Sequence, residues 1–427
     1  MKIIYFFKKI PTILLLVVIP LNAIDNPHFW RATNFLPAFY EPRFERDWLL
    51  SLDATVGFGS TTTARNGNGT KVPLLDIYGT YNMQALGINV PGKNLTNPAD
   101  IALTQLELLP ANEGFAQLSF EGRFKLLEAN LSLSQNIGCG FFIQGHIPVR
   151  QIQITDITQR DLSPLGCDNG PNINTPEWQN FLALFPQILD QYNLSIAPFK
   201  HSGVGDLSIL LGWTNNYEET QEIDYVDTTF RIGALFPTGR KKNEDLVFDI
   251  ANGYNGHYAI PISIDFAIGW YDWFTLGADF GVMTFFKKTR DIRLRTDCLQ
   301  SGLITLTKAP ARIDPGNIWE ANVYMKADHV LCGFSVLLGY SFAMQEHFSI
   351  IPQDTIFFDP VIVNSDERFL GWKMHTINLL LDWDFATYEC PSHPHVGVFG
   401  NFVVGGERIF NTHMGGFAVG IHFIYDF

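Results

Sequence analysis

The last eleven residues, FAVGIHFIYDF, constrain the fold more than any other stretch of this chain. Every second residue of this stretch is large and apolar, and the residues between them, apart from Ile424, are small or polar. Successive side chains of a β-strand point to opposite faces, so this pattern predicts a strand with one apolar and one polar face. Because the sequence stops inside the strand, we expect it to pair with another strand of a closed sheet.

The same alternation recurs along the chain. Long runs occupy 258–270, 330–342 and 377–385, and a period of two over such lengths indicates strands. Strands of about 10 residues suit a tilted crossing of a bilayer. The predicted strands are 48–60, 115–134, 138–154, 204–214, 226–237, 258–270, 274–287, 317–327, 330–343, 372–385, 395–405 and 413–427.

The connections between these strands are alternately short and long. Residues 135–137, 271–273 and 328–329 are short links, whereas 155–203 and 288–316 are long. Short periplasmic turns and long external loops are typical of outer-membrane barrels. The sequence therefore predicts an all-β fold, a transmembrane antiparallel β-barrel of about 12 strands. The sequence does not decide whether 61–114 contains a further hairpin.

The amino end has the layout of a secretory signal peptide. Lys2, Lys8 and Lys9 precede an apolar run at 10–21, and the small residue Ala23 follows. This layout predicts a signal peptide at 1–23 and export to the cell outer membrane. Residues 24–47 are rich in aromatic residues and proline and are expected either in the periplasm or as a plug. The barrel is predicted to span 48–427.

Composition limits the possible partners and covalent links. The net charge is −14, which disfavours nucleic acid as a partner. The five cysteines are an odd number. Cys167 and Cys298 both fall in predicted external loops, so a disulfide between them is a candidate after export. Two free thiols are the equal alternative, since spacing does not fix connectivity.

Strand parity assigns side chains to the lumen, because the face toward lipid must be apolar. The lumen-lining candidates are Asp53, Glu121, Arg123, Asp206, Arg231, Asp265, Asp279, Glu320, Lys326 and Asp382. Such charges can form a conducting constriction or a network of internal ion pairs that fills the barrel. Acids outnumber bases on this face, so a conducting lumen is expected to prefer cations modestly.

Two short motifs add a resemblance to known proteins. Gly203-Val-Gly205-Asp206-Leu207 is followed by FPTGRKK at 236–242. This order resembles the outer-membrane transporters of the phenol-degradation pathway group and, more distantly, the fatty-acid and toluene transporters. The resemblance implies a Gram-negative-type outer-membrane protein for small, hydrophobic molecules. It also implies that the barrel-assembly machinery reads the terminal aromatic residues Phe423, Tyr425 and Phe427, and that outer-membrane lipids surround the barrel.

We therefore expect a channel for passive uptake of small molecules. A non-conducting structural or adhesive barrel is the alternative, and a membrane-embedded hydrolase is a third reading. No Gly-x-Ser-x-Gly elbow is present in the sequence, so no catalytic residue and no cofactor are predicted. His393 and His395 lie in a Cys-Pro-Ser-His-Pro-His run. Its spacing matches no strong ligand pattern and its prolines predict a turn, so no metal is expected.

Two external loops carry further signals. Apolar residues recur at helical spacing from Trp178 to Tyr192, after a helix-start signal at Thr175 and Pro176. This pattern predicts an amphipathic helix, either a lid at the barrel mouth or a helix that packs on neighbouring loops. The loop 288–316 is basic and is predicted to be either solvated or a site for anionic groups.

Overall fold

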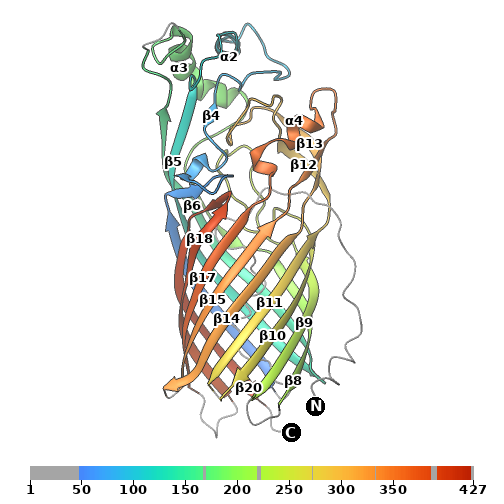
Figure 1. Cartoon of the computed structure of the whole chain (residues 1–427). Coiled ribbons are helices and arrows are strands. Elements are labelled where there is room, and N and C mark those ends of the chain that lie inside the picture. The colour runs from blue at the N-terminus through green and yellow to red at the C-terminus, as the bar shows by residue number, and fades with distance from the viewer. Residues whose placement is uncertain are drawn as a thin grey trace.

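The computed structural model describes residues 48–166, 170–218, 223–271, 273–331, 333–385 and 392–424. Twelve antiparallel strands of this part form a closed barrel (Figure 1). The wall consists of β1 (Trp48–Thr61), β5 (Gln117–Gly138), β6 (Phe141–Asp161), β8 (Leu207–Tyr217), β9 (Tyr225–Phe236), β10 (Ala259–Trp270), β11 (Phe274–Phe285), β14 (Ile318–Leu331), β15 (Phe334–Gln345), β17 (Lys373–Asp384), β18 (Ser392–Glu407) and β20 (His413–Ile424).

The barrel closes where the first and last strands meet. β1 pairs with β20, with Leu52 opposite Ile421 and Val56 opposite Phe417. β1 also pairs with β5, and β5 pairs with β6, which completes the ring. The expectation that the final strand pairs within a closed sheet is therefore confirmed. Closure leaves every wall strand with two neighbours and removes the exposed sheet edges that lipid cannot solvate.

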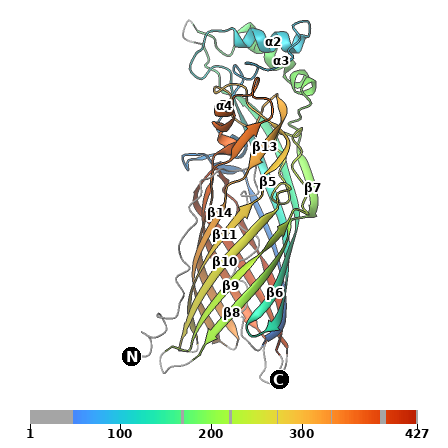
Figure 2. The same ribbon diagram turned by 90° about the vertical axis from the view of Figure 1, so that its right-hand side faces the viewer.

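Short turns and long loops lie at opposite ends of the barrel, as predicted. β5 turns into β6 through Cys139 and Gly140, and β10 turns into β11 through 271–273. The long connections gather at the other end (Figures 1 and 2). Trp48 lies opposite Ile424, so the described chain begins and ends at the short-turn end. The predicted count of 12 strands is confirmed, but β5 and β6 extend to 22 and 21 residues.

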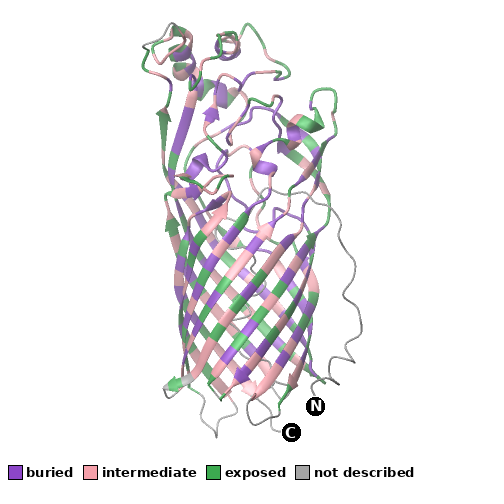
Figure 3. Cartoon of the chain, viewed as in Figure 1, coloured by how far each residue is buried: buried purple, intermediate pink, exposed green. Residues whose placement is uncertain are grey.

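The outer face of the barrel is an apolar belt. In Figure 3 exposed and buried residues alternate along each wall strand. The outward residues include Leu52, Val56, Leu131, Leu133, Ile264, Phe266, Leu276 and Phe280, each more than 40% exposed. So much exposed apolar surface is stable only against hydrocarbon, so the barrel is transmembrane. Among the described helices, none is long and apolar enough to cross a membrane.

The segment 62–116 adds no strand to the wall. It forms β2 (Thr63–Arg65), β3 (Lys71–Pro73), η3 (Leu74–Asp76), β4 (Tyr81–Asn82) and α2 (Pro98–Glu107). β2 pairs with β3 and with β19 (Ile409–Phe410) in a small separate sheet. These pieces pack with the long ends of β5 and β6, so the external loops make a folded cap above the barrel (Figures 1 and 2).

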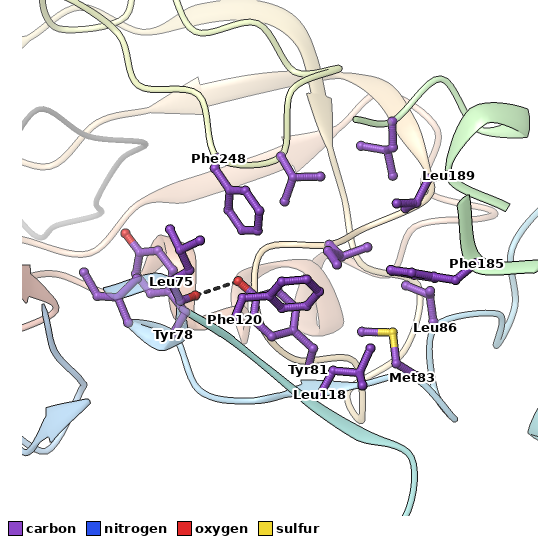
Figure 4. Close-up of a cluster of buried hydrophobic side chains, with 14 of the residues drawn as sticks. Leu75, Tyr78, Tyr81, Met83, Leu86, Leu118, Phe120, Phe185, Leu189 and Phe248 are labelled. Atoms are coloured by element: carbon purple, nitrogen blue, oxygen red, sulfur yellow. Dashed lines mark hydrogen bonds between the residues drawn. The ribbon is translucent and has the colours of Figure 1, made fainter. Parts of the chain in front are cut away.

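The cap has its own hydrophobic core. Figure 4 shows Phe120 of β5 beside Tyr81, Phe248 and other apolar side chains from separate loops. The Tyr81 and Phe120 ring centroids are 4.7 Å apart, and the Tyr81 hydroxyl donates a hydrogen bond to the Leu75 carbonyl at 2.6 Å. Burial of large aromatic side chains stabilises such a core by about 1.5–3 kcal/mol each.

The predicted amphipathic helix is present as α3 (Pro176–Gln191). Its N-cap is Thr175, and Trp178, Phe181 and Phe185 are buried against the cap core. The Trp178 indole N–H donates a hydrogen bond to Asp161 at 2.8 Å. The apolar face is thus occupied by neighbouring loops, which supports the packing interpretation over a free lid.

The basic loop 288–316 is neither disordered nor simply solvated. It forms β12 (Lys288–Arg293) and β13 (Lys308–Asp314), which join β16 (Ser349–Pro352) in a three-stranded sheet. α4 (Pro360–Asn364) and η4 (Glu367–Phe369) pack beside it. Arg293 and Arg295 are only 5% and 6% exposed. Arg293 and Arg295 therefore hold the cap together from inside, whereas Arg312 is exposed.

Asp366 provides a pH-sensitive contact within this part of the cap. Arg368 Nη2 lies 2.7 Å from Asp366 Oδ2, and Arg295 Nε lies 3.8 Å from the same oxygen. Burial acts to raise the Asp366 pKa, but Arg368 and Arg295 outweigh it and hold the pKa below its ordinary value. The stabilisation is thus present above the unfolded-state pKa, about 4, and is lost as the pH falls through the lower folded-state pKa.

We expect acidification below about pH 4 to loosen the cap around Asp366 while the barrel stays closed. The backbone amides of 293–295 and 366–369 should then exchange hydrogen for deuterium faster than the intrinsic pH dependence of amide exchange predicts. Mass spectrometry measures this exchange. Asp366→Asn should produce the same loosening at pH 7, whereas Asp291→Asn, at an exposed position, should not. Equal protection in Asp366→Asn and the native protein at pH 7 would contradict this role.

Candidate functional site

Most of the predicted lumen residues lie on the inner face of the barrel. Buried and exposed positions alternate along each strand and place Asp53, Arg231, Asp265, Asp279, Glu320, Lys326 and Asp382 on that face. Asp206 lies between β7 (Phe199–Val204) and β8 and is 4% exposed. That these side chains line a solute path remains a prediction.

The prediction that Glu121 and Arg123 face the lumen is wrong. Both are exposed, and Arg123 pairs with Asp156 of β6 at 3.3 Å on the outside. Their neighbours Phe120 and Phe124 point inward and are fully buried. The last residue of β1, Thr61, pairs with Phe124, so β5 beyond this level rises above the wall. There water contacts the outer face and the cap core contacts the inner face, so the apolar parity reverses.

The middle of the lumen carries an acidic belt, which we define as Asp227, Asp265, Asp279 and Glu320. Asp265 and Asp279 are direct cross-strand partners of β10 and β11. Arg231 Nη1 lies 3.8 Å from Asp265 Oδ2, and Asn322 donates a hydrogen bond to Asp279 at 2.8 Å. The belt therefore places four acidic side chains on neighbouring strands, with the Arg231 guanidinium beside Asp265.

The acidic belt predicts a salt-dependent cation preference of the ion current. The reversal potential under a salt gradient should indicate cation preference, and this should weaken toward 1 M salt, where the screening length is about 3 Å. Asp265→Asn with Asp279→Asn should shift the reversal potential toward zero, because the two carboxylates lie at one depth. Asp156→Asn, on the outer surface, is the matched control. Anion preference in the native protein would contradict the assignment.

A loop closes the external end of the lumen. This closing loop, residues 237–258 between β9 and β10, is buried without interruption over 247–257. Its Tyr254 ring packs on Phe285 with centroids 5.2 Å apart. Tyr254 belongs to a buried cluster to which β8 to β11, β14, β15, β17 and β18 contribute: Leu210, Leu235, Ala259, Met283, Phe285, Ile318, Ala343, Trp372, Met374, Val403 and Ile409. The closing loop is therefore packed, through Tyr254, against apolar side chains at the external end of the barrel.

Polar contacts hold the closing loop in this position. Asp206 accepts hydrogen bonds from the Gly239 and Tyr254 amides at 2.8 and 2.5 Å. Arg150 Nη1 donates to the Asn252 carbonyl, and Arg150 Nε donates to Glu128 at 2.6 Å. The Arg150 and Glu128 side chains are both 1% exposed. Hydrogen bonds between charged partners are shorter and stronger than neutral ones, so this pair is a firm anchor.

The two sequence motifs contact each other at this point. The Thr238 hydroxyl donates to the Gly205 carbonyl at 2.7 Å and accepts from the Leu207 amide at 3.1 Å. A Cβ at Gly205 would lie 2.7 Å from Pro148 and 2.8 Å from Arg150 Nη1. Glycine thus permits the close approach of loop and wall. Both motifs were identified from the sequence, but Glu128, Arg150 and Tyr254 were not. Strand parity would have placed Glu128 and Arg150 on the inner face, and the turn residues at 252–256 surround Tyr254.

The closing loop also forms one wall of an apolar pocket in the cap. The enclosed space of the pocket is about 30 Å³, inside a wider hollow that is partly open to solvent. Leu74, Leu75 and Ile77 line it from the η3 side, and Phe248 and Ile250 line it from the closing loop. Lys242, Asp249, Asn255 and Arg368 contribute polar groups. Its mostly apolar lining with a few polar groups has the chemistry of a small-molecule site, but ligand pockets measure about 300–1,000 Å³, so a ligand would need the closing loop to move.

Asp249 holds the two arms of the closing loop together. Arg240 Nη1 and Nη2 donate hydrogen bonds to the two Asp249 oxygens at 3.0 and 2.8 Å. The Asn243 amide donates to Asp249 at 2.7 Å. The pocket wall and the segment at the barrel mouth are therefore parts of one internally bonded loop.

Several predicted features fall outside the described residues. These are the signal peptide at 1–23, the segment 24–47, and Tyr425 and Phe427 of the assembly signal. Phe423 is in β20, opposite Leu50. Cys298 is exposed, and its predicted partner Cys167 lies outside the described residues. The disulfide and the assembly signal stay predictions.

Comparison with solved structures yields outer-membrane barrels of low similarity. An outer membrane channel from Pseudomonas putida F1 is 12% identical with a TM-score of 0.45, covering 92% of this chain and 100% of that one. The Pseudomonas putida toluene transporter is 11% identical with a TM-score of 0.29, covering 88% and 89%. A monoaromatic hydrocarbon channel is 7% identical with a TM-score of 0.30, covering 90% of each chain. No family model and no curated protein matches this chain.

Proposed function

We propose that this chain is an outer-membrane channel for passive uptake of small apolar molecules, with no chemical step. The observation that carries the proposal is the double role of the closing loop. Phe248 and Ile250 line the apolar pocket, and Tyr254, four residues later, packs in the buried apolar cluster at the external end of the barrel. A molecule that binds the pocket more tightly when the loop is displaced shifts the population toward an open lumen.

The proposed location rests on the barrel itself and on the predicted export signal at 1–23. A closed wall with an apolar outer belt satisfies its backbone groups internally, as a membrane barrel must. Strands of about 12 residues match the crossing length of a tilted membrane strand.

The test is uptake of a fluorescent apolar probe, N-phenyl-1-naphthylamine, by Gram-negative cells that express the protein in the outer membrane. We expect a saturable uptake rate several-fold above that of cells with an empty vector. Uptake of a polar sugar of similar size should rise much less. No increase for the probe, together with no current steps in a planar bilayer, would overturn the proposal and favour the non-conducting structural barrel.

A further inference from the structure

Two histidines and two carboxylates from four strands meet inside the lumen near the short-turn end. Asp53 comes from β1, Asp382 from β17, His395 from β18 and His422 from β20. His395 Nε2 lies 3.0 Å from Asp53 Oδ1, and His395 Nδ1 lies 3.2 Å from Asp382 Oδ1. These side chains are each between 10% and 17% exposed. The group is distant along the strands from the closing loop, which occupies the other end.

Three of these residues can direct one ligand atom each toward a common point. The ligand atoms of Asp53, His395 and His422 all lie within 4.8 Å of one another. His422 Nε2 lies 3.9 Å from Asp53 Oδ1, and His395 Nε2 lies 3.0 Å from it. Zinc–ligand bonds of 2.0–2.2 Å in a tetrahedron separate ligand atoms by about 3.4 Å. The two observed separations lie on either side of this value.

The His422 ring has an unused nitrogen in this cluster. Its Nε2 is buried and has no hydrogen-bond partner among the described residues. The His395 and His422 rings are 15° from parallel, with centroids 5.1 Å apart. His422 therefore has to turn about its Cβ–Cγ bond to aim its lone pair at an ion shared with His395, and no hydrogen bond of Nε2 opposes that rotation.

Asp382 has the position of an orienting carboxylate. It faces His395 Nδ1, whereas the other ring nitrogen faces Asp53. Metal-binding histidines commonly donate the second ring N–H to a carboxylate, which fixes the tautomer and the ring orientation. Asp382 can thus hold His395 in place while Nε2 binds an ion.

Glycines create the space in which the cluster forms. Gly420 is the direct strand partner of both His395 and Asp53. A Cβ at Gly420 would overlap His395 Nε2 and Asp53 Oδ1. A Cβ at Gly397 would lie 2.9 Å from Asp382 Oδ1. The side chains therefore meet directly over a glycine, in a space that any other residue would fill.

We propose that Asp53, His395 and His422 form a binding site for a divalent transition-metal ion of the zinc class, with Asp382 as the positioning residue. Two imidazoles and one carboxylate are ligands that zinc, nickel and copper accept, and three protein ligands leave a position for water or solute. Asp384 and His393 face the same end of the lumen and add one acid and one base nearby. The site goes beyond the proposed channel function and does not depend on it.

The test is isothermal titration calorimetry of the purified full barrel in detergent with zinc chloride, after removal of any histidine tag. We expect one zinc ion per chain. His422→Asn should weaken the affinity at least 100-fold, because a ligand is lost. Asp382→Asn should weaken it by about 10- to 100-fold, as for other orienting partners. His413→Asn, at an exposed position of the same strand, should leave the affinity unchanged.

Gly420→Ala tests the space of the site independently of its ligands. This variant keeps all four side chains but fills the space over which they meet. We expect this variant to lose zinc binding while its heat-modifiable migration on gels shows a folded barrel. Absence of zinc binding to the native protein, or equal affinity in the native, His422→Asn and Gly420→Ala proteins, would overturn the site and leave an internal ion-pair cluster. Probe uptake without added metal should be the same in the His422→Asn and native proteins, which separates this test from that of the channel.

Discussion

Removal of residues 243–255 from the closing loop, with Lys242 joined to Gly256, should raise the single-channel conductance in planar bilayers several-fold. The deletion removes Tyr254 and its neighbours from the buried apolar cluster, so we expect water and ions to enter the lumen from the external end. The new connection is short enough, because the Lys242 amide lies 3.0 Å from Asn255 Oδ1. The native protein should show small or rare current steps.

A point variant tests the same closure with little change in volume. Asp206→Ala removes the acceptor of the Gly239 and Tyr254 amides, at a cost of about 1–3 kcal/mol for each buried donor left unpaired. Openings should become about ten times more frequent or more, since 1.4 kcal/mol corresponds to a factor of ten. Asp156→Ala is the control. Equal conductance in the deletion, Asp206→Ala and native proteins would show that the loop does not limit the passage.

The second large effect concerns the pocket in the cap. Ala251→Phe should reduce the affinity for N-phenyl-1-naphthylamine by about tenfold or more, measured by fluorescence titration of the purified protein. Ala251 lines the pocket and is 3% exposed. A phenyl group there occupies the space of an apolar ring, whose burial is worth about 1.5–3 kcal/mol. The probe should therefore lose most of its contact area.

Ala197→Phe is the matched control, because Ala197 is exposed on another loop. It makes the same chemical change without entering the pocket, so it should bind the probe as the native protein does. Unchanged binding by Ala251→Phe would mean that the probe binds elsewhere, for example on the apolar belt. In cells, Ala251→Phe should lower the saturable part of probe uptake. This result would show that the pocket takes part in the proposed passage.

The sequence by itself determined the class of fold. A period of two in hydrophobicity follows from strand geometry and from the apolar solvent around the barrel, and both are local properties. The alternation of short and long links then specified the topology, and the Thr175–Pro176 start specified α3. Strand parity predicted the wrong face for Glu121 and Arg123. β5 leaves the bilayer at this level, so its outer face contacts water and its inner face contacts the cap core. The alternation of a strand does not show how much of its length lies inside the membrane.

Tertiary structure alone decided which polar residues meet. Asp53 and His422 lie near opposite ends of the chain, and only barrel closure makes their strands neighbours. The spacing of His393 and His395 in sequence therefore carried no metal signal, although His395 faces a carboxylate through each ring nitrogen. The sequence did not predict the fold of the closing loop either, because its burial depends on side chains contributed by many separate strands and loops. Strand patterns report the solvent on each face, whereas a site depends on long-range register, which no local pattern contains.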